Sequence, residues 1–266
     1  MSKISTLLVF GAILGFSILP SRAADVSVVV PNANANLAGS AEIGEVLNGY
    51  NSDLGQTVQY VIAASDLLPL QNTTLTGLSF RLNNYYAPSL PEIDYSNFTI
   101  VLSASPDSPL STVFADNIQN GTVAYQAPFT FAAGALPTGA PAGSDIPNDF
   151  GTFIKFSTPY YYTTGDMLVT LSHSQPSGGE TSDYWSVDGN SSATPTLIAH
   201  DQAATEASVE WYVTPITEFT TSDSLPDNAP AAIPEPGTYA MIFLGFALLV
   251  FWQKSTSFIR TRGTNR

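Results

Sequence analysis

The sequence predicts an all-β fold, either a single β-sandwich or a jelly roll, formed by residues 24–220. At several places apolar and polar residues alternate with a period of two, as they do in strands with one buried face. Clusters of Pro, Gly, Asn and Asp separate these places and favour turns. Only residues 41–47 show even weak helical character.

About ten short strands are expected along this segment. Clear alternation carries four of them, at residues 78–83, 98–103, 167–172 and 209–213. In each, large apolar side chains would cover one face of a sheet while polar ones face away. The remaining candidates, in chain order, are residues 26–30, 58–63, 112–115, 122–125, 153–156 and 197–200.

Charge and cysteine content exclude several classes of function. The 266 residues include 22 acidic and 8 basic residues and no cysteine. Without cysteine there is no disulfide scaffold and no thiolate metal site. Only Arg81 and Lys155 are basic between residues 24 and 232, a segment that holds 21 of the acids. A nucleic-acid partner is not expected, because neutralising phosphates needs clustered Lys and Arg.

Residues 1–23 are predicted to be a secretory signal peptide. Lys3 supplies the positive start, and residues 7–19 are almost wholly apolar. Ser21 and Ala23 place small residues at the −3 and −1 positions of a cut before Ala24. Signal peptidase is therefore an expected partner, and the domain is expected to leave the cytosol.

The C-terminal end divides into a linker, a short motif and an apolar run. Residues 221–232 are polar and rich in Pro and Ala, which is typical of a linker. In the motif Pro234, Glu235 and Pro236, the prolines prevent regular helix and hold the glutamate extended, as a protease requires. The apolar run over residues 238–252 predicts a transmembrane helix.

The flanks of this run predict its orientation. Expected membrane and topology residues are Tyr239, Trp252, Lys254, Arg260, Arg262 and Arg266. The two aromatic residues would lie at the membrane interfaces, and Lys254 would extend towards the headgroups. The basic residues place the tail, residues 253–266, in the cytoplasm by the positive-inside rule, so the domain would face outward.

The last 34 residues, 233–266, resemble the PEP-CTERM sorting signal of exported bacterial proteins, which membrane protease-transpeptidases called exosortases process. The resemblance rests on Pro234-Glu235-Pro236, the following Gly-Thr-Tyr-Ala, the apolar helix and the basic end. It implies that an exosortase-like enzyme reads the motif, that the helix is removed, and that the domain passes to the cell envelope or the exterior. Residues 59–65, 75–82 and 111–117 are similar to strands of PEP-CTERM and choice-of-anchor ectodomains, which implies a β-sandwich and no activity.

Candidates for catalysis are few. His173 and His200 are the only histidines, and there is no G-x-S-x-G motif. Both are expected to be surface or loop-bonded rather than catalytic. General acid–base catalysis by paired carboxylates could use Glu92 with Asp94, or Asp183 with Asp188. One carboxyl of the pair would then have to be buried, because burial raises its pKa. Solvated loop acids are expected instead, and no enzyme is expected.

Calcium is the one cofactor for which the sequence offers candidates, since hard cations take carboxylates, amides and carbonyls. The first candidate group is Asp183, Asp188 and Asn190. A second group is Asp145, Asn148 and Asp149. Neither follows the EF-hand spacing, and the alternative is that these side chains bond their own backbone in turns.

Paired aromatic residues suggest a glycan surface. The clusters are Tyr85-Tyr86, Tyr160-Tyr161-Tyr162 and Tyr184-Trp185. Their rings combine an apolar body with a polar handle, which suits stacking on sugars. Adjacent residues on a strand point to opposite faces, so about half of each cluster is expected in the core. The candidate glycan contacts are Tyr85, Tyr86 and Trp185.

The sequence thus predicts an exported structural or interaction protein of the cell envelope or extracellular matrix. Its precursor would lie in the inner membrane before processing. A carbohydrate-binding module on the same export route, with extracellular polysaccharide as partner, is the alternative. A secreted hydrolase is the third hypothesis.

Overall fold

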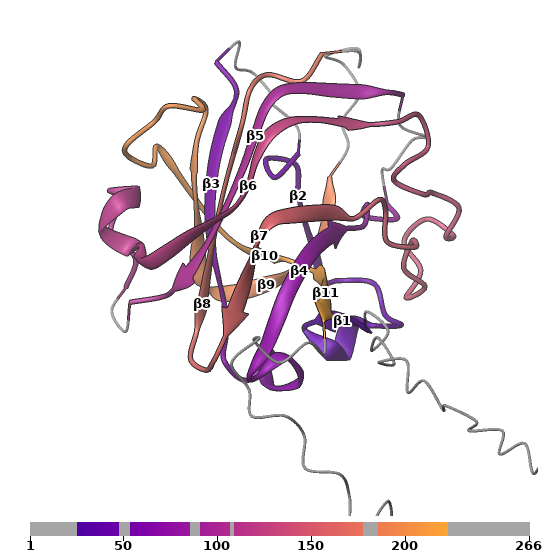
Figure 1. Ribbon diagram of the computed structural model, residues 1–266. Coiled ribbons are helices and arrows are strands. Elements are labelled where there is room, and N and C mark those ends of the chain that lie inside the picture. The colour runs from indigo at the N-terminus through magenta and orange to yellow at the C-terminus, as the bar shows by residue number, and fades with distance from the viewer. Residues whose placement is uncertain (1–25, 48–53, 86–90, 107–108, 178–185, 223–266) are drawn as a thin grey trace, which may run out of the picture. The chain divides into compact units, whose positions relative to one another are not determined.

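The computed structural model describes residues 26–47, 54–85, 91–106, 109–177 and 186–222. They form an all-β domain with two antiparallel sheets, which confirms that the fold is all-β (Figure 1). The predicted signal peptide, sorting motif and C-terminal helix lie outside these residues. Within the described ranges, no helix has the length and hydrophobicity required to cross a membrane.

The smaller sheet has four strands in the order β1-β11-β4-β7. Its strands are β1 (Val26–Val30), β11 (Thr217–Ser222), β4 (Thr73–Phe80) and β7 (Ile154–Tyr162). β11 pairs with β1 on one side and with β4 on the other. The last described strand therefore joins β1, the first strand, to the rest of the sheet. Both neighbours are antiparallel to it.

The larger sheet has seven strands, six of them in the order β10-β9-β3-β8-β5-β6, with β2 paired to β9. These are β10 (Val209–Pro215), β9 (Val187–Ala199), β3 (Gln56–Ile62), β8 (Met167–His173), β5 (Ile93–Ala104), β6 (Gln119–Phe131) and β2 (Ala41–Ile43). Short 3-10 helices are η1 (Asn32–Asn34), η2 (Leu68–Leu70) and η3 (Phe114–Asn117).

The main hydrophobic core draws on both sheets. Alternate residues of the larger sheet, such as Tyr60 on β3, Ile100 on β5 and Val169 on β8, are fully buried, as are Leu78 and Phe219 of the smaller one. Burying a large apolar side chain stabilises a fold by about 1.5–3 kcal/mol. The alternation predicted at residues 98–103 and 167–172 is therefore confirmed.

A second, smaller cluster covers the opposite face of the larger sheet. Phe114 of η3 packs there with Leu197 and Ala199 of β9. Gln59 of β3 is buried beneath it, donating to the Phe114 carbonyl oxygen at 3.1 Å and accepting from Asn117 Nδ2 at 2.7 Å. This part of the sheet is consequently buried on both faces.

Three sequence predictions about secondary structure are wrong. Residues 41–47 form β2 and a turn rather than helix, because Ala41–Ile43 pairs with β9. Residues 112–115 lead into η3 instead of forming a strand. β11 was not anticipated, and it includes Thr221 and Ser222, which the sequence placed in the linker.

The predicted apolar face of residues 209–213 is confirmed only in part: Val209 and Val213 are half-buried against the main core, whereas Trp211 is not. β10 does form, but its register on β9 shifts between Trp211 and Val213, which interrupts the simple alternation. Trp211 is 39% exposed and Tyr212 is 56% exposed. Because β10 is the edge strand of the larger sheet, its side chains are not covered as those of a central strand are.

Candidate functional site

The candidate site lies where the chain passes from one sheet to the other. β4 ends at Phe80, and the extended residues after it pair with the beginning of β9. Leu82 bridges Val187, and the Asp188 N–H donates to the Arg81 carbonyl oxygen at 2.9 Å. This crossing brings the Arg81 side chain against Asp188, which is 107 residues away in sequence.

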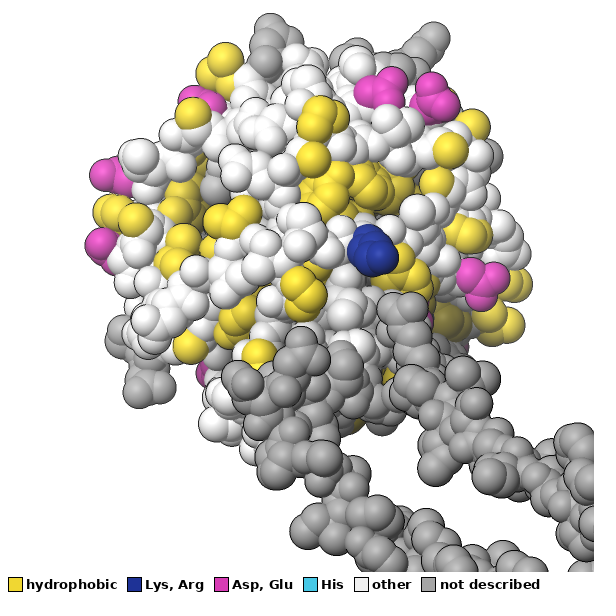
Figure 2. Space-filling model, in the orientation of Figure 1, with side chains coloured by type: hydrophobic (Ala, Val, Ile, Leu, Met, Phe, Trp, Pro, Cys, Tyr) yellow, Lys and Arg dark blue, Asp and Glu magenta, His cyan; other side chains and the backbone are white. Residues whose placement is uncertain are grey.

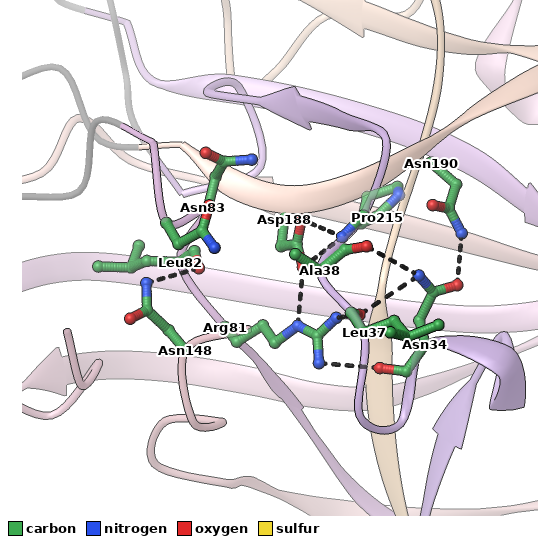
Figure 3. Close-up of polar contacts among 12 residues, drawn as sticks. Asn34, Leu37, Ala38, Arg81, Leu82, Asn83, Asn148, Asp188, Asn190 and Pro215 are labelled. Atoms are coloured by element: carbon green, nitrogen blue, oxygen red, sulfur yellow. Dashed lines mark hydrogen bonds and ion pairs between the residues drawn. The ribbon is translucent and has the colours of Figure 1, made fainter. Parts of the chain in front are cut away.

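Arg81 and Asp188 form a buried ion pair (Figure 3). Arg81 Nε donates to Asp188 Oδ2 at 2.8 Å, and the two side chains are only 1% and 2% exposed. The remaining guanidinium nitrogens donate to the carbonyl oxygens of Asn34 at 2.9 Å and Leu37 at 2.6 Å. The guanidinium carbon also lies 5.1 Å from the centre of the Phe150 ring, a cation–π contact.

Hydrogen bonds to Arg81 and to two residues of β9, Asp188 and Asn190, hold residues 34–40 against β9. The Gly39 N–H donates to the Asp188 carboxylate at 3.0 and 3.1 Å, and Ser40 N–H donates to Asn190 Oδ1 at 3.2 Å. Gly39 has no room for a side chain, since an added Cβ would lie 2.1 Å from the Gly189 carbonyl oxygen. Desolvation lowers the pKa of Arg81 and raises that of Asp188, and the attraction between them opposes both shifts.

A cleft of about 310 Å³ adjoins this network, and we call it the Tyr85 cleft. Its lining includes Ser40, Glu42, Asn84, Tyr85, Gly143 and Asp145. Asn84 Nδ2 donates to the carbonyl oxygens of Ser144 at 2.9 Å and Ile146 at 2.6 Å, which joins the two loops that form its wall. Burial raises the pKa of Glu42, whose Oε2 is buried and has no hydrogen-bond partner.

The structure brings one of the three predicted glycan contacts to this cleft. Tyr85 is 58% exposed, whereas Tyr86 and Trp185 lie outside the described residues. Sequence reasoning missed Glu42, Asn84 and Gly143, which are scattered along the chain and carry no motif. On β7, Tyr162 is buried and Tyr161 is exposed, as expected for adjacent residues on a strand.

Asp188 was expected to be a solvated loop acid, and this is wrong. It lies on β9, is buried, and already accepts hydrogen bonds from Arg81 and Gly39. Asn190 holds Ser40 and donates to Asn34 Oδ1 at 2.7 Å. Asp183 lies outside the described residues, so calcium at this group stays a prediction; a cation there would compete with the Arg81 guanidinium.

The remaining candidates for a metal site or for acid–base catalysis differ in burial and in hydrogen bonding. Asn148 is buried and engaged, accepting from the Ala140 N–H at 3.0 Å and donating to the Leu82 carbonyl oxygen at 3.1 Å. Asp145 and Asp149 are exposed, and Glu92 is exposed as well. On β5, Asp94 accepts from the Thr130 hydroxyl. No three His, Asp or Glu side chains in the described part of the chain gather closely enough to hold a metal ion.

His173 was expected to be either at the surface or bonded to a loop. Its Nδ1 lies 2.8 Å from the Ser174 carbonyl oxygen just after β8, but the surface alternative is wrong because the side chain is buried. It ends β8 inside the core, with its ring 4.9 Å from that of Tyr95 and stacked 5.9 Å from that of Phe98. Desolvation lowers its pKa to about 4, although backbone groups of Ser174 and Glu45 oppose the shift. A ring in this position is closed to substrate. His200 directly follows β9 and is partly exposed.

The buried imidazole predicts a pH-dependent stability. In the unfolded chain His173 is protonated below its ordinary pKa of 6.5, but the folded ring resists protonation down to about 4. The wild-type fold should therefore lose about 3 kcal/mol relative to His173→Phe as pH falls from 7 to 4. Urea unfolding of both proteins across this range measures the difference, with His200→Gln as control. Parallel curves for wild type and His173→Phe would contradict the assignment.

Comparison with known proteins adds no assignment. The chain matches no protein-family model, and no curated protein is similar enough to count as a relative. The arrangement itself has two chemical features: a buried ion pair with further hydrogen bonds to the backbone, and beside it a cleft lined by an exposed tyrosine together with acidic residues and serines.

Proposed function

We propose that the chain is an exported bacterial protein of the cell envelope or extracellular matrix, with its β-domain in a structural or interaction role. Signal peptidase removes residues 1–23, and an exosortase-like enzyme cuts at the C-terminal signal. The observation that carries this proposal is the succession, at the end of the chain, of Pro234-Glu235-Pro236, an apolar run and a basic tail. The protein is not an enzyme in this proposal.

The end of the β-domain supports this arrangement. β11 finishes at Ser222, and residues 223–233 separate it from the motif. We propose that this stretch keeps the motif accessible to the processing enzyme. The run over residues 238–252 then serves as a transmembrane helix, with Tyr239 and Trp252 at the interfaces and a cytoplasmic tail, until it is removed. The two sheets then remain as a sandwich or jelly-roll ectodomain.

The scarcity of exposed basic side chains on the described domain is consistent with an exported protein. Arg81 is buried, which leaves Lys155 as the exposed basic side chain of the described residues. Figure 2 shows that basic side chains are sparse on one face, where the backbone and uncharged side chains, many of them hydrophobic, form most of the coloured and white surface. Such a surface has little attraction for nucleic acid or for anionic lipid headgroups.

Changing the sorting motif should abolish C-terminal processing. In Pro234→Ala with Glu235→Ala, the extended, proline-framed substrate is lost, so we expect the protein to stay in the inner membrane at precursor length minus its signal peptide. Membrane fractionation in the producing bacterium, followed by intact mass measurement, detects this outcome. The matched control is Pro226→Ala with Asp227→Ala in the linker, which should be processed normally. Unaltered processing of the motif variant would refute the sorting proposal.

Glycan binding is the second candidate function, and one observation favours it. Tyr85 is exposed at a cleft that also holds carboxylates and hydroxyls, a combination that suits sugar rings. A hydrolytic function based on His173 has no comparable support, because that ring is buried among Tyr95 and Phe98.

A further inference from the structure

We propose that the Tyr85 cleft is a binding site for a neutral saccharide. The proposal rests on glycan binding, the second candidate function above, and gives it a location and a ligand class. It does not depend on how the C-terminus is processed.

The first component is an aromatic platform held in place by the backbone. The Tyr85 N–H donates to Asn83 Oδ1 at 2.7 Å, which fixes the turn that carries the ring. One edge of the ring contacts Gly143, where an added Cβ would lie 3.2 Å from Cδ2 and Cε2. Gly143 has a φ of +68°, a conformation that favours glycine. The ring is thus supported from one side while 58% of the residue stays exposed.

The second component is a carboxylate with an unsatisfied acceptor, carried by a residue that lines the cleft. Glu42 follows Ala41 on β2, and its Oε2 is buried without a hydrogen-bond partner. Leaving such an acceptor unpaired is unfavourable, and a ligand that donates a hydrogen bond to the carboxylate relieves part of that penalty. Sugar hydroxyls are donors of this kind. Ser40 and Ser144 also line the cleft, and their hydroxyl oxygens accept from the Ser191 and Ile146 N–H groups.

The third component is charge. The described lining of the cleft contains Glu42 and Asp145 and no Lys, Arg or His. With a net charge of −14 on the whole chain, phosphates and uronic acids would be repelled. A volume of about 310 Å³ is at the lower end for small-molecule sites, which suits a short stretch of a neutral oligosaccharide.

The fourth component is rigidity supplied by the ion-pair network. Asp188 fixes Gly39, and Asn190 fixes Ser40, both on the cleft wall. A hydrogen bond from Asn84 to Ser144 joins two further lining residues. A site whose walls are already bonded loses little conformational entropy when a ligand enters. The buried pair between Arg81 and Asp188 therefore positions this site without touching the ligand.

The test measures binding to the full chain, purified in mild detergent, by saturation-transfer NMR and calorimetry. The probes are cellohexaose, laminarihexaose and maltohexaose as neutral sugars, hexagalacturonate as an anionic sugar, and hexalysine as a cation. We expect at least one neutral sugar to bind with a Kd below about 1 mM, and no binding of the charged probes. Tyr85→Ala should weaken binding about tenfold, because it removes the stacking surface.

Three further variants show whether a change in binding reflects a direct contact or a folding defect. Tyr85→Phe keeps the ring and should retain most of the affinity, whereas Glu42→Gln should weaken binding severalfold. Tyr161→Ala, at a tyrosine that is 46% exposed on β7 outside the cleft, should leave the affinity unchanged.

The proposal is overturned if none of the three neutral sugars binds at about 10 mM. Equal loss in Tyr161→Ala, or hexalysine binding that Tyr85→Ala abolishes, would also overturn it. Normal C-terminal processing alongside any of these results would leave the export proposal intact.

Discussion

Replacing Arg81 with Ala is expected to lower the free energy of unfolding by about 3–5 kcal/mol. The change leaves the Asp188 carboxylate buried with the Gly39 N–H but without its counter-charge. It also removes one donor from each of the carbonyl oxygens of Asn34 and Leu37. Urea unfolding followed by circular dichroism at neutral pH measures the loss.

Two variants test whether the buried pair is the cause. Lys155→Ala removes the exposed cation on β7 and should change stability by less than about 0.5 kcal/mol. Arg81→Met combined with Asp188→Leu removes both charges and should recover a large part of the lost stability, since neither charge is then left unpaired. A loss below about 1 kcal/mol in Arg81→Ala would show that the pair is solvated.

Ending the chain at Ile216 is expected to abolish cooperative folding. That truncation deletes β11, which holds β1 and β4 together in the smaller sheet. It removes the buried Phe219 ring and the Thr217 hydroxyl, which lies 3.3 Å from the Tyr60 hydroxyl of the other sheet. Losing a central strand should exceed the 5–15 kcal/mol by which domains are typically stable.

The matched control ends at Asn228 and likewise lacks the sorting signal, but it keeps every described strand. Thermal unfolding of the Asn228 truncation should give the same midpoint as the full chain. The Ile216 truncation should show no cooperative transition and should be degraded in the producing cell. A midpoint within a few degrees of the control would mean that β11 is dispensable.

The core strands could be predicted because their buried apolar side chains recur at every second residue, as the pleat of a strand requires. Ile100 on β5 and Val169 on β8 belong to clean alternations, and both are buried. β11 was missed because residues 217–222 carry few large apolar side chains and Phe219 alone marks its buried face. β10 was found, but its exposed edge position and its bulge depend on neighbouring strands that the local pattern does not reveal.

The site was less predictable because its parts are distant in sequence. Asp188 looked like a turn residue beside Gly189 and Asn190, and only the pairing of β9 with residues after β4 buries it. One signal was available. Arg81 is one of two basic residues between positions 24 and 232, and it stands inside an apolar alternation. A lone cation in such a position predicts a buried partner of opposite charge.

The most direct test of the proposed export and sorting is the intact mass of the wild-type protein recovered from outside the inner membrane of its producing bacterium. We expect one main species that begins at Ala24, retains β11, and lacks the apolar run over residues 238–252 and the basic tail. A main species that extends through Arg266 would contradict it, because the C-terminal segment would then be a permanent part of the mature protein.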